Sequence, residues 1–280
     1  MKKEIEPFLV PDQAYVWLQN SSVGITKYPE TTSIIAAYCD HEAQTTIVPP
    51  KEIARELMEA DKTELMCDDI FWFIEKVLRD TYYQIKDPYA SYELGCLYYF
   101  DRFNHVDYAK AFKYFSKEDQ FNESNTMVGV CYFYGQGIEQ NYEKAYHLLV
   151  KAALTDASAW ALYLLGDMYK NGYYVNQDVL EAHDLYHHAF EISNKLKFTK
   201  YTQAEILMRM GQDFFERPKD QEDIQKALEI FNYAERLYID SIKEGNPNIK
   251  EKIKDVRDKQ SRVKLLLDQI LFENKDTYVN

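Results

Sequence analysis

Hydrophobic positions between residues 87 and 247 recur in long stretches of helical spacing that short polar turns interrupt. Four glycines mark the recurrence, because an aromatic residue follows each of them after three positions and an alanine follows after sixteen. The glycines are 34, 37 and 45 residues apart, and they are Gly95, Gly129, Gly166 and Gly211. Register kept through four copies predicts four units, each a helix, a short loop and a second helix.

The residue types at these positions have a physical reason. Glycine and alanine lack bulk, so two helices can approach each other closely there, and the aromatic residue fills the space beside them. A short acid or amide just before each second helix is placed to accept hydrogen bonds from its unpaired backbone amides. These expected N-caps are Asp107, Asn141, Asp178 and Asp223. The spacing therefore predicts stacked antiparallel helix pairs.

Residues 248–280 follow a Gly-Asn-Pro helix stop and form a charged segment with an apolar stripe. The stripe has intervals of 4-3-4-3-4-3 and consists of Ile249, Ile253, Val256, Gln260, Val263, Leu267 and Ile270. Such a stripe favours a capping helix that covers the open end of the repeat array. Self-association or binding of a partner helix is the alternative.

Residues 1–86 do not share the repeat. Ser33–Tyr38 and Thr45–Val48 are expected as short strands, Lys51–Ala60 as a helix, and Leu65–Tyr83 as a second, apolar helix. This small N-terminal segment would then be α+β, and its last helix would cap the first repeat. The expected domains are 1–86, 87–247 and 248–280.

The second unit resembles a known family. Its residues Val128 to Ile138, Val-Gly-Val-Cys-Tyr-Phe-Tyr-Gly-Gln-Gly-Ile, and the later Asn141-Tyr142-Glu143-Lys144-Ala145 are similar to the Sel1-like repeat, a relative of the tetratricopeptide repeat. The third unit matches well, although Tyr174 replaces a loop glycine; the first keeps its skeleton without the loop glycines, and the fourth keeps only the skeleton. The resemblance implies an all-α solenoid of αα-hairpins in a right-handed superhelix, used for protein–protein contact.

Composition and charge narrow the classes of function that we expect. A net charge of −13 argues against direct binding of nucleic acid, which depends on basic patches. No apolar run long enough for a signal peptide or membrane span is visible, and Cys39, Cys67, Cys96 and Cys131 form no close pair. These features predict a cytoplasmic protein with reduced, buried thiols.

No catalytic arrangement is apparent, and we expect neither an enzyme nor a cofactor. His183 and His187 have the i, i+4 spacing of a metal-binding pair but no third ligand, so a structural role is favoured. Cys39 and His41 are too close in sequence for the usual nucleophile–base geometry. Gly135-Gln136-Gly137 follows a helix and lacks the third glycine of a dinucleotide loop.

A partner is expected on the concave face, which the first helices of such arrays line. Positions −6, −3, +1 and +4 from each glycine fall on one helical stripe. The predicted contact residues are Tyr89, Tyr92, Tyr99, Phe133, Trp160, Tyr163 and Lys170. The sequence thus favours a scaffold or adaptor that binds a protein or peptide through aromatic anchors. The alternative is an acidic inhibitor or immunity-type protein that captures a basic enzyme, for which binding would be steeply salt-dependent.

Overall fold

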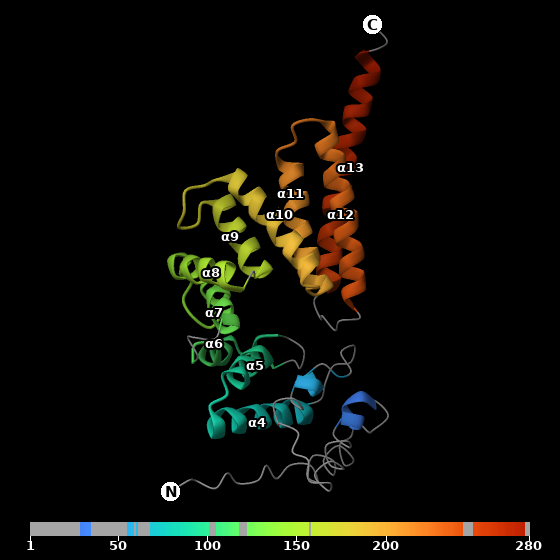
Figure 1. Ribbon diagram of the computed structural model, residues 1–280. Coiled ribbons are helices and arrows are strands. Elements are labelled where there is room, and N and C mark those ends of the chain that lie inside the picture. The colour runs from blue at the N-terminus through green and yellow to red at the C-terminus, as the bar shows by residue number, and fades with distance from the viewer. Residues whose placement is uncertain are drawn as a thin grey trace, which may run out of the picture. The chain divides into compact units, whose positions relative to one another are not determined.

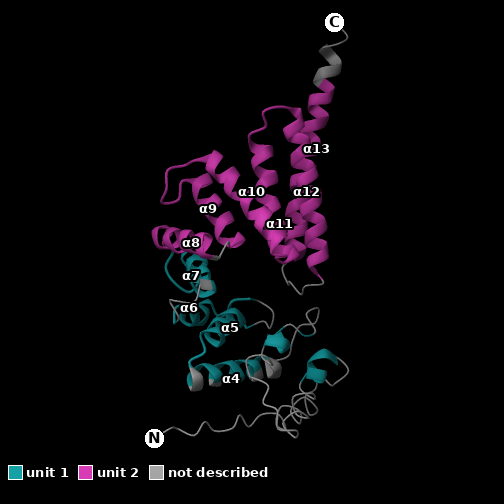
Figure 2. Ribbon diagram, in the orientation of Figure 1, with its two compact units in different colours: residues 1–140 teal, residues 141–280 magenta. Residues whose placement is uncertain are grey.

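A computed structural model describes residues 29–34, 55–58, 60, 68–100, 105–117, 122–156, 158–242 and 249–277 (Figure 1). Every regular element among them is a helix, which confirms the predicted all-α repeat class. The chain divides into two compact units, residues 1–140 and 141–280 (Figure 2). Helices α7 and α8 of the second repeat fall in different units, and each is described with its own.

The first unit contains the first repeat and the helices beside it. Its long helices are α4 (Asp68–Ile85), α5 (Pro88–Tyr99), α6 (Tyr108–Phe115) and α7 (Asn122–Tyr134). Each packs on the next in sequence order, α4 on α5, α5 on α6 and α6 on α7. Residues 29–34 and 55–58 are also helical. The apolar helix predicted at Leu65–Tyr83 corresponds to α4, which packs on α5.

The second unit is a run of antiparallel helices that also pack in sequence order (Figure 1). They are α8 (Tyr142–Asp156), α9 (Ala159–Asn171), α10 (Val179–Lys195), α11 (Lys200–Glu216), α12 (Gln221–Ser241) and α13 (Ile249–Thr277). Helix α13 packs against α12, and its stripe residues Ile249, Val256, Gln260 and Val263 are buried there. The predicted helix and the buried part of its stripe are therefore confirmed.

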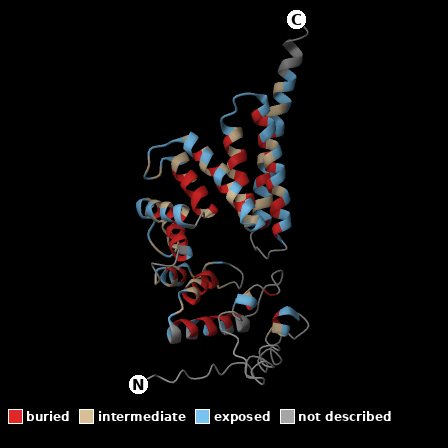
Figure 3. Cartoon of the chain, in the orientation of Figure 1, coloured by how far each residue is buried: buried red, intermediate tan, exposed pale blue. Residues whose placement is uncertain are grey.

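Close packing of the first, third and fourth helix pairs depends on a glycine of the first helix and an aromatic ring of the second. The ring of Phe115 lies on Gly95, that of Tyr186 on Gly166 and that of Phe231 on Gly211, in each case twenty residues further along. A Cβ atom on Gly166 would lie 2.6 Å from Tyr186 Cε1, closer than any side chain permits. The buried residues accordingly lie between the paired helices (Figure 3).

Three of the four predicted N-caps are confirmed. The side chain of Asp107 accepts from Lys110 N, that of Asn141 from Lys144 N, and that of Asp178 from Leu180 N and Glu181 N. The prediction for Asp223 is wrong. Helix α12 begins earlier, with Asp220 as its cap, and Asp223 closes the first turn by accepting from Lys219 N. The two acids satisfy donors on both sides of the helix start, as in a capping box.

The strand predicted at Ser33–Tyr38 is wrong at its start, because residues 29–34 form a helical turn that Pro29 opens. The preset φ of proline suits the first position of a helix and outweighs the local preference of two isoleucines for strands. Residues 35–38 and the second expected strand, 45–48, lie outside the described residues. Of the helix predicted at 51–60, residues 55–58 are described and helical.

Candidate functional site

The predicted contact residues of the first unit lie on α5 and α7. Tyr89, Tyr92 and Tyr99 are half-buried, and the rings of Tyr89 and Tyr92 lie 6.2 Å apart. Tyr99 donates a 2.5 Å hydrogen bond from its hydroxyl to Gln136 Oε1. Phe133 on α7 is only 6% exposed. The three tyrosines are therefore within reach of a partner, whereas Phe133 belongs mainly to the core.

The predicted residues of the second unit all lie on α9. Trp160 is half-buried, and Tyr163 is 5% exposed. The guanidinium of Arg209, from α11, lies 4.4 Å from the centre of the Tyr163 ring. Lys170 Nζ pairs with Glu216 Oε2 of α11 at 2.7 Å. Tyr163 thus supports a cation from the neighbouring repeat, and Lys170 bridges the same two helices.

Beside Tyr163, Asp167 completes a site for this guanidinium, which we call the α9 site (Tyr163, Asp167 and Arg209). Arg209 Nε donates to Asp167 Oδ1 and Oδ2 at 2.8 Å, and its Nη2 lies 2.8 Å from Oδ2. The hydroxyl of Tyr186 on α10 donates to Asp167 Oδ1 at 2.8 Å. A planar guanidinium bound by a carboxylate and stacked on an aromatic ring combines the interactions to which arginine is suited.

A second arrangement of this kind, the α11 site, consists of Tyr201, Glu205 and Lys252 of α13. Lys252 Nζ lies 2.6 Å from Glu205 Oε1 and 5.9 Å from the centre of the Tyr201 ring. The hydroxyl of Tyr238 also donates to Glu205 Oε1, at 2.7 Å. Burial alone would raise the pKa of Glu205, but the cations Arg209 and Lys252 outweigh it and lower that pKa below its ordinary value.

In the first unit, the α5 site consists of Tyr89, Glu93 and Arg55. Tyr89 and Glu93 lie four residues apart on α5, and the positive charge of Arg55, from a short helical segment before the repeats, acts to lower the pKa of both groups. Burial and the neighbouring Glu93 raise the pKa of Tyr89 to about 12. Glu93 is 8% exposed, and its burial raises its pKa despite Tyr89 and Arg55, which lower it.

The glycine-based stripe includes Asp167 and Glu205, which were not among the predicted contact residues, and it misses Glu93 and the three cations, although a signal was present. In each site an acid follows a tyrosine by four residues on a first helix: Tyr89 and Glu93, Tyr163 and Asp167, Tyr201 and Glu205. Residues four apart share one face of a helix. The stripe based on the glycines included the tyrosines of two sites, but gave no reason to look for the cations that other elements supply.

The two histidines of the i, i+4 pair, His183 and His187, contact each other and an acid of the next helix. His183 Nδ1 lies 2.8 Å from Asp213 Oδ2, and the rings of His183 and His187 are 4.4 Å apart. Across the described part of the chain, no group of three or more His, Cys, Asp and Glu residues could hold a metal ion. Cys96 and Cys131 are buried free thiols, as predicted. Among the helices that the structure describes, none is both long and apolar enough to span a membrane.

Helix pairs packed in sequence order, with a glycine–aromatic contact in each of three repeats, define a helical-repeat protein. A family model for the Sel1 repeat matches residues 88–117, 122–154 and 161–191, so the chain carries three Sel1 repeats. These ranges correspond to α5–α6, α7–α8 and α9–α10. The fourth predicted unit, α11–α12, lies outside the matched ranges.

Two solved structures are similar in fold. A Sel1 repeat protein from Oxalobacter formigenes is 16% identical, with a TM-score of 0.48 over 74% of this chain and 82% of that one. The second is c5321, a protective antigen of uropathogenic Escherichia coli strains that displays an SLR fold. It is 15% identical, with a TM-score of 0.43 over 95% of this chain and 65% of that one. No curated protein sequence matches the chain. Sel1-repeat proteins generally mediate protein–protein interactions.

Proposed function

We propose that this protein is a non-catalytic scaffold or adaptor that binds a protein or peptide partner through the first helices of its repeats, α5 and α7 in the first unit and α9 and α11 in the second. The observation that carries the proposal is the set of half-buried aromatic side chains on these helices, Tyr89, Tyr92 and Tyr99 in the first unit and Trp160 in the second, in a chain with Sel1 repeats. Large aromatic residues that are partly exposed supply binding energy at little cost in side-chain entropy.

The burial of the other predicted residues refines their roles. Phe133 and Tyr163 are nearly inaccessible, so they would support the surface from beneath. Lys170 has an acid partner within the chain, as do Arg209 and Lys252. Charges that are matched internally gain little from a charged partner, because an existing pair would have to be broken. The internal pairing of these cations therefore favours binding through aromatic side chains over the capture of a basic enzyme by charge.

The test is affinity capture from native lysate with identification of the bound protein by mass spectrometry. The Tyr99→Ala/Trp160→Ala variant should retain less than a tenth of the stoichiometric partner, with an unchanged circular dichroism spectrum. A matched control, Leu180→Ala/Tyr233→Ala, alters exposed apolar side chains of second helices and should retain the partner. Loss in the control alone, or equal capture by all three proteins, would contradict the proposal. Loss of capture in high salt would instead favour the acidic inhibitor.

A further inference from the structure

Helix α13 changes character along its length. Up to Val263 it packs against α12, and the side chains that stay exposed there are all polar or charged. The next nine residues, 264–272, contain no buried side chain, and half of their exposed positions hold a large apolar residue. Leu265 is 61% exposed, Leu271 51% and Phe272 68%. We call residues 264–272 the α13 end, and it presents an apolar surface to solvent.

The α13 end reaches past the start of α12. Gln260 Nε2 donates to the carbonyl oxygen of Phe231, which aligns the two antiparallel helices. Ten residues further along α13, Ile270 lies level with the first residue of α12. Beyond this point α13 continues as a single helix that extends past α12 (Figure 1). Leu271 and Phe272 are therefore exposed because α12 is too short to cover them.

The sequence of the α13 end has a symmetric pattern. Residues 265–272 are Leu-Leu-Leu-Asp-Gln-Ile-Leu-Phe, so three apolar residues, two polar ones and three apolar ones follow each other. The residues on either side, Lys264 and Glu273, have opposite charges. A contact between two copies related by a two-fold axis requires a surface that is complementary to itself. Two antiparallel α13 ends meet this requirement, because Leu265 then lies opposite Phe272 and Lys264 opposite Glu273.

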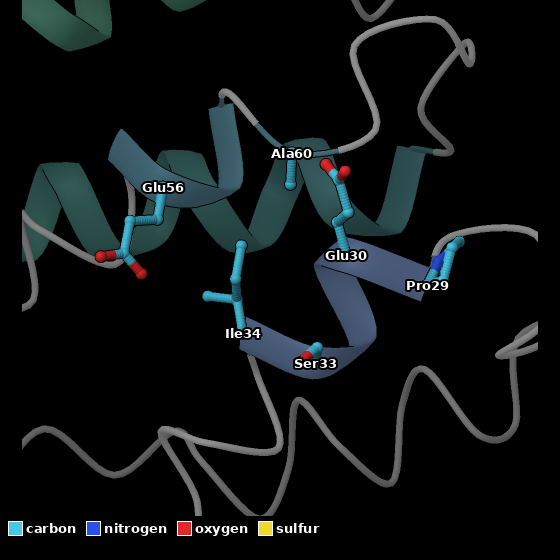
Figure 4. Close-up of a pocket in the computed structure, with 6 residues that line it drawn as sticks. All are labelled: Pro29, Glu30, Ser33, Ile34, Glu56 and Ala60. Carbon is cyan, nitrogen blue, oxygen red and sulfur yellow. The ribbon is translucent and has the colours of Figure 1, made fainter.

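A hollow in the first unit lacks such a pattern. It is lined by residues of the helical turn 29–34 and by Glu56 and Ala60, so that two acids, Glu30 and Glu56, stand among small and apolar side chains (Figure 4). These residue types suit many ligands and identify none of them. The α13 end differs from this hollow because its own pattern specifies the surface that complements it.

The size of the surface determines how strong the pairing can be. Besides its three exposed apolar residues, the α13 end has three that are half-buried, Leu266, Leu267 and Ile270. Specific interfaces bury about 500 Å² or more on each partner, and six apolar side chains supply an area of that order. We therefore expect a dissociation constant in the micromolar range and a dimer that exchanges with the monomer.

We propose that the α13 end is a dimerisation surface on which two copies of this chain pair in antiparallel orientation. A helix of another protein could bind an apolar surface of any pattern, whereas the symmetric pattern is required only by a second copy. α13 then has two roles, since its first part covers the last repeat and its end joins two molecules. The dimer carries two sets of repeats, so a partner with two binding segments would be held with avidity.

Sedimentation velocity of the full chain between about 1 and 200 μM measures the association. The mass should rise with concentration from 33.2 kDa toward twice that value. Leu265→Gln/Phe272→Gln should raise the dissociation constant about tenfold or more, with an unchanged circular dichroism spectrum. The matched control, Leu154→Gln/Leu180→Gln, alters leucines that are 82% and 74% exposed elsewhere in the second unit, and it should dimerise like the wild type.

Charge exchange tests the antiparallel orientation. Lys264→Glu and Glu273→Lys each place like charges opposite one another, so each variant should dimerise about threefold or more weakly than the wild type. An equimolar mixture of the two variants brings opposite charges together again and should recover the affinity of the wild type.

A monomer at every concentration, or a dimer indifferent to Leu265 and Phe272, would overturn the dimerisation surface. Charge variants that dimerise like the wild type would overturn the antiparallel pairing. The charge variants also decide the matter alone if the glutamine variant loses helicity, because their like charges must then weaken the dimer and their mixture must restore it.

Discussion

The α9 and α5 sites combine the same kinds of side chain, a tyrosine, an acid four residues later and an arginine, yet they differ in how the arginine is held. Arg209 belongs to a long helix packed in the array, contacts both carboxylate oxygens of Asp167 and stacks on Tyr163. Arg55 is exposed and comes from a short segment outside the repeats. A bidentate, buried pair joins two helices permanently, whereas an exposed pair can exchange. Position in the array, and not residue type, thus separates a guanidinium that is held between two helices from one that is exposed to solvent.

The largest expected effect follows from breaking the α9 site. Asp167→Ala removes the acceptor of Arg209 Nε and Nη2 and of the Tyr186 hydroxyl in a mostly buried place, and leaves Glu205 as the acid partner of Arg209. Removal of one partner of a buried pair costs about 3–5 kcal/mol, and we expect a loss of this order in the free energy of unfolding measured with urea. The exposed pair of Asp255 and Lys259 provides the control, since Asp255→Ala should cost less than about 0.5 kcal/mol.

A double variant tests whether the loss of stability in Asp167→Ala comes from the charge that it leaves behind. Asp167→Leu/Arg209→Met removes both charges together, and replacement of a buried ion pair by apolar residues of similar volume is often neutral. The double variant should therefore recover part of the stability lost in Asp167→Ala, because Lys252 still pairs with Glu205 while the Tyr186 hydroxyl stays without its acceptor. Equal losses in Asp167→Ala and Asp255→Ala would show that the α9 site is no tighter than a surface pair, and the contrast with the α5 site would then fail.

The next largest effect concerns the close contact that positions these first helices. In Gly166→Ala the new methyl group would meet the Tyr186 ring, which must move and so disturb its hydrogen bond to Asp167. Overpacking of this kind costs about 1–3 kcal/mol, and thermal unfolding should show it as a lower Tm. Gly95→Ala, against the Phe115 ring, should cost as much although Phe115 has no hydroxyl to lose. A neutral outcome at both positions would contradict the role assigned to the glycines.

The repeat could be predicted because it depends on contacts close in sequence. Glycine register, helix pairs and the caps at Asp107, Asn141 and Asp178 all arise within some twenty residues of chain and repeat, so one copy supports the next. An aromatic residue also follows Gly95, Gly166 and Gly211 after twenty positions, but the prediction used only the alanine that follows after sixteen. Local periodicity was therefore sufficient to predict most of the fold.

The sites were only half predictable. Aromatic positions followed from the stripe, but the partners of Asp167 and Glu205 lie 42 and 47 residues further along, on separate helices. Nothing in the local pattern relates such residues, because the stacking of one repeat on the next brings them together. The burial of Phe133 and Tyr163 could not be predicted either, because the glycine-based stripe does not distinguish the exposed edge of a helix from the side that a neighbouring helix covers.

Acid titration offers a third test, in which the contributions of Glu205 and Glu93 to stability should change with pH in opposite directions. The pKa of Glu205 is lowered in the fold, so its contribution is present above the ordinary carboxyl pKa and is lost as the pH falls through the folded value. The pKa of Glu93 is raised, so its buried charge costs stability above that pKa, and the cost disappears as the pH falls. Urea unfolding from pH 7 down to about pH 2 covers the range in which both contributions change.

Glutamine substitutions separate the two acids. Glu205→Gln should lower stability at neutral pH and flatten the decline on the acid side, by a change on the order of 1 kcal/mol. Glu93→Gln keeps an acceptor for Tyr89 without the buried charge, so it should preserve or raise stability at neutral pH. Destabilisation by Glu93→Gln equal to that of Glu205→Gln would contradict the opposite signs expected for the two acids.

The smallest effect is expected at Lys252, which occupies an intermediate position between the two arginines. Its side chain is 37% exposed and pairs with Glu205 across α11 and α13, while Arg209 and Tyr238 also contact that carboxylate. Water screens the ammonium, and Arg209 remains to balance the acid, so Lys252→Met should cost less than about 1 kcal/mol in urea unfolding. The matched variant Lys226→Met removes a more exposed partner of Glu222 and should cost still less. A loss at Lys252 as large as that of Asp167→Ala would show that the exposure of the cation does not determine how much each site contributes to stability.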